Sequence, residues 1–146
     1  MKVVVQKVFN ASCISSGKIY GKINKGYLLL VSFNNTDKLD NIKKMAKKID
    51  GLRIFDDENG KMNLNIHDVN GKILSISQFT LYANPYTGNR PSFTSCLNGD
   101  DAKKLYDLFN QELRNNYHLK VEEGNFGHHM QLDISCDGPT TIELEY

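Results

Sequence analysis

The longest run of apolar residues, Tyr27 to Val31, is the sequence feature that most restricts the fold. A strand over Tyr27–Phe33 has no polar face, so it must be covered on both sides, as a strand in the middle of a layered sheet is. The run is far too short to cross a bilayer, which takes roughly 20 residues. The sequence therefore predicts a buried central strand in a soluble protein.

Further strands are predicted on both sides of this run. The segment Val3–Ile14 is rich in β-branched residues, and Lys18–Asn24 alternates apolar and polar positions. Strands are also expected over Leu52–Phe55 and Ile73–Phe79. The segment Leu119–Tyr146 is expected to form two or three more strands.

Two segments have helical periodicity. The first helix is expected to be capped by Thr36 or Asp37 and to end at Gly51, and the second to begin at Asp100 or Asp101. The predicted inward positions are Leu39, Ile42, Met45, Ala46 and Ile49 in the first helix, and Ala102, Leu105, Tyr106, Leu108, Phe109 and Leu113 in the second. Because the helices interrupt the strands without regular alternation, the predicted class is a mixed, strand-rich α/β fold, with one domain over residues 1–146.

Composition narrows the function classes. A net charge of +1 gives no overall attraction to nucleic acid, so any contact with RNA must be local. The three cysteines, Cys13, Cys96 and Cys136, are odd in number and widely spaced, which favours free thiols in a reducing compartment. The apolar stretch at the N-terminus is too short for a secretion signal, so we expect a cytoplasmic protein.

Two short segments, far apart in the chain, form the candidate site. Ser77-Gln78-Phe79-Thr80-Leu81 and Asp137-Gly138-Pro139-Thr140-Thr141 each place small hydroxyl or amide residues at the end of an apolar strand. Backbone N–H and C=O groups that have no ladder partner there can face a ligand. The chain has no G-x-S-x-G elbow, and none of its four histidines lies in a nucleophile or metal motif. The sequence therefore predicts a site built largely from main chain.

Together the two segments resemble the signature motifs of the D-aminoacyl-tRNA deacylases, which hydrolyse the ester that joins a D-amino acid to tRNA. The likeness includes Val4-Val5-Gln6, Leu52-Arg53-Ile54-Phe55, Gly60-Lys61-Met62-Asn63-Leu64, Gly88-Asn89-Arg90-Pro91-Ser92-Phe93 and Phe126-Gly127. The resemblance implies a compact α/β fold with mostly antiparallel strands and two main helices. It also implies a homodimer that acts on aminoacyl-tRNA, including glycyl-tRNA(Ala), without a cofactor or metal.

The resemblance also implies roles for both motifs. The catalytic residues that line the acyl pocket would be Ser77, Gln78, Phe79 and Thr80. The Gly138–Pro139 bond would be cis, and its carbonyls would enter the partner's active site, bind the substrate α-amino group and exclude an L side chain. Without the resemblance a trans turn is favoured, because only about 5 to 6% of X-Pro bonds in folded proteins are cis.

Several residues keep two interpretations. Thr80 could be a covalent nucleophile, although the sequence identifies no adjacent base, or an ordinary strand hydroxyl like Ser77. In the long loop predicted over Tyr82–Gly99, Phe93 could stack on the terminal adenosine and Arg90 could meet a phosphate, so both are candidate substrate-binding residues. Alternatively, Phe93 anchors the loop in the core and Arg90 is solvated.

Two clusters outside the motifs also have alternatives. The lysines of the first helix could follow the acceptor stem of tRNA or could simply be solvated: Lys43, Lys44, Lys47 and Lys48. His128 and His129 suggest a metal site with Asp133, but neighbours on a strand point to opposite faces, so we expect no metal there.

The chain departs from the family pattern at two positions. Cys136 stands where the family usually has Asn, and Lys7 stands where it usually has an Arg that is believed to brace the Gly-Pro segment. Lysine lacks the planar fork of arginine. Two rival functions therefore stay open: a related deacylase that edits small L-aminoacyl-tRNAs, and a paralogue that binds nucleic acid without catalysis.

Overall fold

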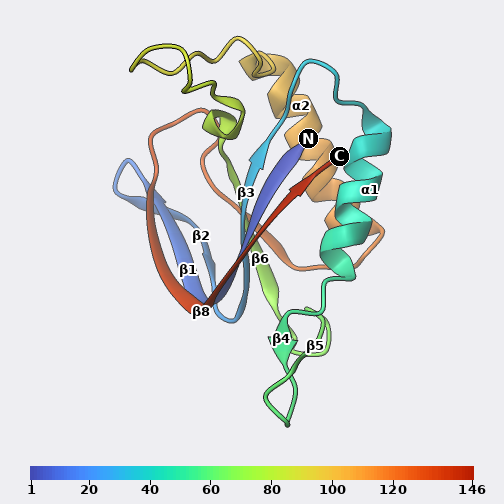
Figure 1. Ribbon diagram of the computed structural model, residues 1–146. Coiled ribbons are helices and arrows are strands. Elements are labelled where there is room, and N and C mark those ends of the chain that lie inside the picture. Colours follow the sequence, from blue (N-terminus) through green and yellow to red (C-terminus); the bar gives the residue numbers. More distant parts are fainter.

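The structure, a computed structural model, describes residues 1–146 and is built around a six-stranded sheet (Figure 1). The strand order is β2-β1-β3-β6-β7, and β8 pairs with β1. The strands are β1 (Lys2–Ser15), β2 (Lys18–Ile23), β3 (Gly26–Ser32), β6 (Lys72–Ser77), β7 (Val121–Glu123) and β8 (Gln131–Glu145). Strands β4 (Phe55–Asp56) and β5 (Met62–Leu64) form a separate hairpin, and the helices are α1 (Leu39–Asp50), α2 (Gly99–Asn115) and the 3-10 helix η1 (Phe79–Tyr82).

Strand β3 is the centre of the sheet, as its apolar run predicts. It pairs antiparallel with β1 and parallel with β6, and all of its residues except Leu30 are buried. The other pairings of β1 and the β4–β5 hairpin are antiparallel, so the predicted fold class, mixed and mostly antiparallel with two main helices, is confirmed. The parallel pairing of β3 and β6 places their carboxyl ends side by side.

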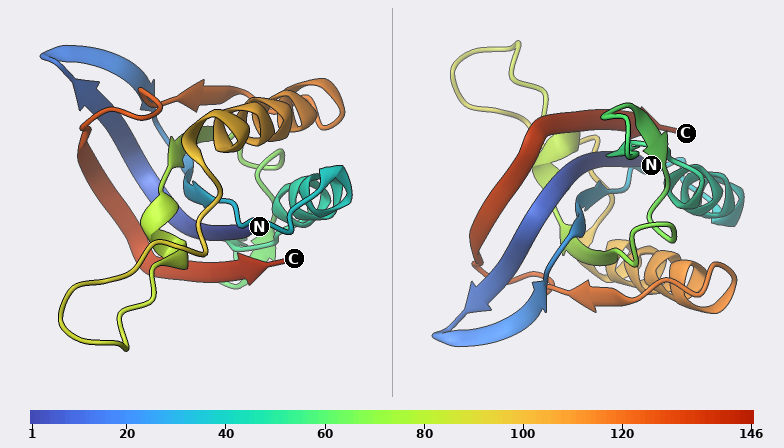
Figure 2. Two further views of the ribbon diagram at one scale, coloured as in Figure 1. Left: turned by 90° about the horizontal axis from the view of Figure 1, so that it is seen from above. Right: turned by 90° about the horizontal axis from the view of Figure 1, so that it is seen from below.

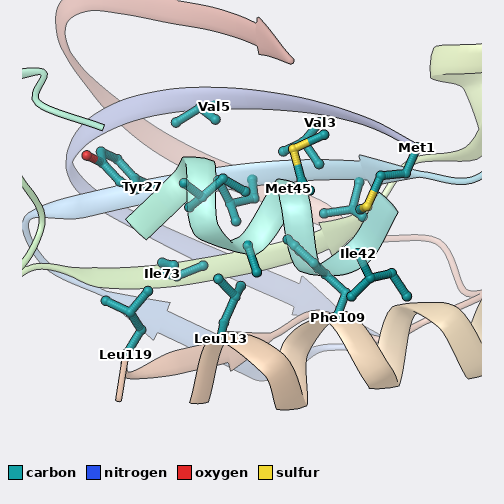
Figure 3. Close-up of a cluster of buried hydrophobic side chains, with 14 of the residues drawn as sticks. Met1, Val3, Val5, Tyr27, Ile42, Met45, Ile73, Phe109, Leu113 and Leu119 are labelled. Atoms are coloured by element: carbon teal, nitrogen blue, oxygen red, sulfur yellow. The ribbon is translucent and has the colours of Figure 1, made fainter. Parts of the chain in front are cut away.

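Helices α1 and α2 cover one face of the sheet (Figures 1 and 2). A cluster of 19 buried residues fills the space between the two helices and the sheet. Figure 3 shows side chains from both helices and from β1 and β3 meeting there. Helix α1 contributes Ile42, Met45, Ala46 and Ile49, as predicted. Neither helix is both long and apolar enough to span a membrane.

The other face of the sheet is covered by the sheet itself. A second cluster joins residues of β1 and β2 to residues of β3 and β6: Val8, Ala11, Cys13, Ile23, Leu28, Leu74 and Ile76. Strand β2 lies so close to β7 that a Cβ at Gly21 would stand 2.8 Å from the carbonyl oxygen of Glu123. Only glycine allows this approach.

The predicted N-terminal caps are wrong, whereas α1 ends at Gly51, its C-cap, as predicted. The N-cap of α1 is Lys38, because Asp37 instead accepts hydrogen bonds from the backbone N–H of Asn34 (2.8 Å) and from the N-terminal ammonium group. The N-cap of α2 is Asn98, whose side chain accepts a hydrogen bond from the backbone N–H of Asp101 (3.1 Å). Leu39 and Leu108, predicted to face inward, are exposed. The face that each helix buries is narrower than the set of apolar positions in its sequence.

Three predicted strands also differ from the structure. Only Phe55 of the segment Leu52–Phe55 is in a strand, and β6 ends at Ser77, so Phe79 belongs to η1. In the last segment, β8 is not broken by Gly138–Pro139 but runs through it. Shifts in the register between β1 and β8 absorb the irregular backbone.

The difference between two neighbours in α2 tests this packing. We expect Phe109→Ala to lower the free energy of unfolding by about 3 to 5 kcal/mol, because the ring is fully buried. The matched variant Leu108→Ala removes a side chain that is 43% exposed, so it should cost about 0.5 kcal/mol or less. Urea unfolding of the two variants measures both values, and equal losses would contradict the assignment of the helix faces.

Candidate active site

The first motif lies where the chain leaves β6. The backbone N–H of Gln78 donates to the carbonyl oxygen of Val31 (2.8 Å), which extends the pairing with β3 by one bond. The chain then turns into η1, where the N–H of Leu81 donates to the carbonyl of Gln78 (3.2 Å). The side-chain amide of Gln78 donates to Oγ1 of Thr80. The motif is therefore a strand end, as predicted, followed by a tight turn, and the strand ends at Ser77 and not at the predicted Phe79.

Two backbone N–H groups of this turn have no hydrogen-bond acceptor within the chain, those of Phe79 and Thr80. They are the first N–H groups of a helical turn, which have no partner inside the helix. The carbonyl oxygen of Phe79 is held by Oγ of Ser32 (3.3 Å) and Sγ of Cys96 (3.2 Å). Since C=O and N–H point in opposite directions across a trans peptide, fixing this carbonyl also fixes the direction of the Thr80 N–H.

Cys96 is a suitable donor for this role. Burial raises the pKa of its thiol above the usual value, so the sulfur keeps its proton at neutral pH and can donate it. No sequence pattern connects Cys96 or Ser32 with the site, because both contacts depend on the tertiary fold.

Two hollows flank the first motif and share Ser77, Gln78, Phe79 and Gly127. One, of about 230 Å³, is also lined by Val31, Ser32, Phe33, Leu97, Gly99, Ala102 and Phe126. The other, of about 320 Å³, is also lined by Ile76, His128, His129, Met130 and Leu132. Apolar lining with a few polar groups is typical of sites that bind small organic groups. Three of the four predicted catalytic residues, Ser77, Gln78 and Phe79, line both hollows, whereas Thr80 lines neither.

The loop before α2 lies beside Phe79. The rings of Phe79 and Phe93 are 5.1 Å apart at 59°, and they are 56% and 42% exposed. Phe93 is therefore not in the core, and the interpretation that it anchors the loop there is wrong. Paired backbone hydrogen bonds between Asn84 and Ser92 (2.8 and 2.9 Å) close the loop, and Arg90, at its exposed end, forms no ion pair within the chain.

The second motif lies in the middle of β8. The Gly138–Pro139 peptide bond is cis, and Gly138 has a φ of 114°, which side chains rarely adopt. Both residues are exposed. Gln6 of β1 holds the residues that follow Pro139. Its side-chain amide donates a hydrogen bond to the carbonyl of Thr140 (3.2 Å) and accepts one from the hydroxyl of Thr141. The segment therefore projects from a strand that is fixed by side-chain hydrogen bonds.

Lys7 contacts Asp137, the residue that precedes Gly138 in the second motif. Its side chain is 2% exposed, and its Nζ lies 3.7 Å from Oδ1 of Asp137 and 3.3 Å from Oδ2 of Asp56. Cys136 is exposed and pairs with Val8 through the backbone. The two departures from the family pattern thus differ, because the Lys7 side chain contacts the motif through its charge, whereas Cys136 pairs with β1 through its main chain.

The two motifs are far apart within one chain. The second lies opposite Gln6 and Lys7, which pair with Leu28 and Tyr27 of β3, whereas the first extends from Val31. Four residues along a strand and three strand spacings give a separation of about 20 Å. Figure 1 agrees, with η1 at the top of the sheet and the bend of β8 near β4. One chain therefore does not bring the motifs into one site.

Residues 4–145 match the family model described as D-Tyr-tRNA(Tyr) deacylase. The chain belongs to this deacylase family. Two curated relatives named D-aminoacyl-tRNA deacylase are similar over nearly their whole length. The protein of Lactobacillus gasseri is 51% identical over 146 residues, with 99% of each chain covered. That of Thermosipho africanus is 49% identical over 145 residues, which cover 99% of this chain and 97% of the relative.

Two solved structures share the fold of this deacylase. A protein titled c-Myc DNA Unwinding Element Binding Protein is 37% identical, with a TM-score of 0.94 and coverage of 100% of this chain and 99% of that one. A probable eukaryotic D-amino acid tRNA deacylase is 15% identical with a TM-score of 0.85, over 98% and 97% of the two chains. At that identity the second likeness concerns the fold alone.

The lysines of α1 and the two adjacent histidines, which lie outside both motifs, form no evident binding site in the deacylase. Lys44 pairs with Asp40 (2.7 Å), and Lys44, Lys47 and Lys48 line a shallow hollow beside Tyr146. His128 and His129 lie in the loop between β7 and β8 and not on a strand, so the argument from alternating faces does not apply to them. No three His, Cys, Asp or Glu side chains gather as a metal-ligand set.

The backbone at Gly138 gives a prediction for the deacylase. A Cβ there would lie 2.7 Å from Oγ1 of Thr140, and a left-handed φ costs a residue with a side chain about 1 to 2 kcal/mol. Gly138→Ala should therefore lower the free energy of unfolding by at least about 1 kcal/mol. Gly99→Ala is the control, since a Cβ there meets nothing within 4 Å. Urea unfolding compares the two, and a loss confined to Gly99→Ala would be inconsistent with the described backbone.

Proposed function

We propose that the chain hydrolyses the ester of D-aminoacyl-tRNA, and of glycyl-tRNA(Ala), and releases the free amino acid and tRNA. The family match and the names of the relatives support a carboxylic ester hydrolase that acts on aminoacyl-tRNA. The observation that carries the mechanism is the pair of unpartnered N–H groups at Phe79 and Thr80, beside two hollows. We place this activity in the cytoplasm, without a cofactor or metal.

Ester hydrolysis passes through a tetrahedral oxyanion, and the two N–H groups are suited to stabilise it. One well-placed oxyanion donor contributes about 3 to 4 kcal/mol to the lowering of the barrier. The fixed carbonyl of Phe79 keeps the Thr80 donor in one direction before the substrate arrives, and such preorganisation is what makes a donor effective. Because the aminoacyl ester is an activated substrate, two donors and good positioning supply much of the acceleration without a triad.

The surroundings of Thr80 favour a non-covalent role. Its hydroxyl accepts a hydrogen bond from the amide of Gln78, which is not a base. An activated nucleophile needs an adjacent base within hydrogen-bond distance, and no His, Asp or Glu forms a hydrogen bond with this hydroxyl. We therefore assign the chemistry to the main chain and to a water molecule.

Rejection of L-amino acids is assigned to the Gly138–Pro139 segment of a second copy of the chain. Three features support this: the two motifs are about 20 Å apart in one chain, the outer edge of β8 has no partner, and Phe9 and Ile134 are exposed beside it. An unpaired strand edge with exposed apolar residues is suited to pairing with another copy. A backbone barrier that blocks an L side chain would admit glycine, which has none.

Two rival functions have their own support. The replacement of the usual Arg by Lys7 leaves open a deacylase that edits small L-aminoacyl-tRNAs, but the ion pair of Lys7 with Asp137 favours a rigid filter. The similarity to a protein titled as binding a DNA unwinding element favours a paralogue that binds nucleic acid. A protein that only binds nucleic acid would not need the unpartnered N–H groups of Phe79 and Thr80, which argues against this rival.

Deacylation of D- and L-tyrosyl-tRNA tests the proposal. We expect the D ester to be hydrolysed at least about 100-fold faster, since a steric clash of a few kcal/mol corresponds to that ratio. Glycyl-tRNA(Ala) should be hydrolysed, and L-alanyl-tRNA should not. Hydrolysis of L-alanyl-tRNA would favour the first rival, and binding of tRNA without turnover would favour the second.

The same assay at decreasing protein concentration tests the second copy. If the filter comes from a partner, selectivity for the D ester should fall once sedimentation shows dissociation into single chains. Constant selectivity in a fully dissociated sample would rule out a shared site.

The role of the Thr80 hydroxyl is tested by replacing it. We expect Thr80→Ala to reduce kcat by about tenfold or less, because the N–H donor stays and only one side-chain hydrogen bond is lost. Loss of a covalent nucleophile would cost at least about a thousandfold. Single-turnover kinetics of Thr80→Ala and of the control Thr80→Ser measure the difference, and an inactive Ala variant beside an active Ser variant would point to a covalent role.

A further inference from the structure

Three charged side chains from three different strands meet behind the second motif. Lys7 of β1 lies between Asp56 of β4 and Asp137 of β8, with Nζ to Oδ distances of 3.3 and 3.7 Å. The side chains are 2%, 49% and 17% exposed, respectively. The ammonium group is therefore buried between two carboxylates, one of which adjoins Gly138.

The two contacts of Lys7 are not equivalent. The contact with Asp56 is a hydrogen bond, whereas that with Asp137 is an electrostatic attraction over a longer distance. A buried ammonium group needs both charge compensation and hydrogen-bond acceptors. Asp56 thus fixes the position of Lys7, and Lys7 in turn attracts Asp137. Because a lysine is a point charge on a flexible stem, a single carboxylate would not hold it in one place.

The residues on both sides of Asp56 are held in place. Its neighbour Phe55 is fully buried and stacks on Tyr27, with ring centres 5.1 Å apart at 15°. Beyond it, the carboxylate of Asp57 accepts from the backbone N–H groups of Asn59 (2.9 Å) and Lys61 (3.1 Å) and so closes the turn of the hairpin. The β4–β5 hairpin is therefore a fixed support, anchored in the core at one end and closed at the other.

We propose that Asp56 is a positioning residue for the Gly138–Pro139 segment and acts on it through Lys7 and Asp137. A lysine needs this second carboxylate, whereas a planar guanidinium at position 7 would reach Asp137 with two parallel hydrogen bonds by itself. The hairpin thereby determines how rigidly the segment is held. This inference rests on the proposed function for its effect on substrate choice.

The variant Asp56→Asn tests the inference in the full-length protein. It should lower the ratio of kcat/KM for D- over L-tyrosyl-tRNA by about five- to thirtyfold, with kcat for the D ester nearly unchanged. Glu58→Gln is the matched control, because it removes the same charge from the same hairpin at an exposed residue that has no ion pair. Adding Lys7→Arg to Asp56→Asn should restore the ratio, which a merely structural role of Asp56 would not predict.

Amide hydrogen exchange over residues 136–141 gives a second measurement that does not depend on activity. We expect exchange to be at least about fivefold faster in Asp56→Asn than in the unchanged protein or in Glu58→Gln. An unchanged D/L ratio with unchanged exchange would overturn the inference, and so would equal losses for both esters without rescue by Lys7→Arg. Faster exchange in a protein that hydrolyses neither ester would support the positioning role and contradict the proposed function.

Discussion

The burial of β3 on both faces is the constraint on which the rest of the structure depends. A strand without a polar side must be covered twice, and this chain has only two long helices, which both pack on one face. The other face is covered because β1 and β2 curl over β3 and β6. This arrangement leaves the carboxyl ends of β3 and β6 adjacent, and the first motif leaves the sheet from that point.

The same arrangement explains why backbone groups without a partner lie at the candidate site. Where β6 ends, its next residues turn away from the ladder, and a new helical turn begins with N–H groups that have no partner. Residues from β3 and from the loop before α2 then hold the one carbonyl whose direction decides where the Thr80 donor points. The fold thus supplies backbone N–H groups of fixed direction at a strand end.

Local patterns in the sequence predicted the elements of this fold but not their ends. The apolar run at β3 identifies the central strand, and the periodic positions Ile42, Met45 and Phe109 identify the helix faces. Both could be predicted because buried positions require apolar residues at a regular spacing. The cap of α1 could not be predicted, because Asp37 is engaged by the N-terminal ammonium group, a contact between distant parts of the chain. The continuity of β8 was missed for a similar reason, because it depends on its register with β1. Both motifs were found in the sequence, but Ser32, Cys96 and Asp56, which hold them, give no local signal.

The unpartnered N–H of Thr80 has a consequence for how such a protein tolerates genetic change. A group that belongs to the peptide bond persists through every replacement at its own position except proline, which lacks it. Selection on side-chain identity at this residue is correspondingly relaxed, while selection on the residues that orient the peptide is not. Over generations, side chains should therefore change at position 80 sooner than at Ser32 and Cys96, which hold the peptide in place.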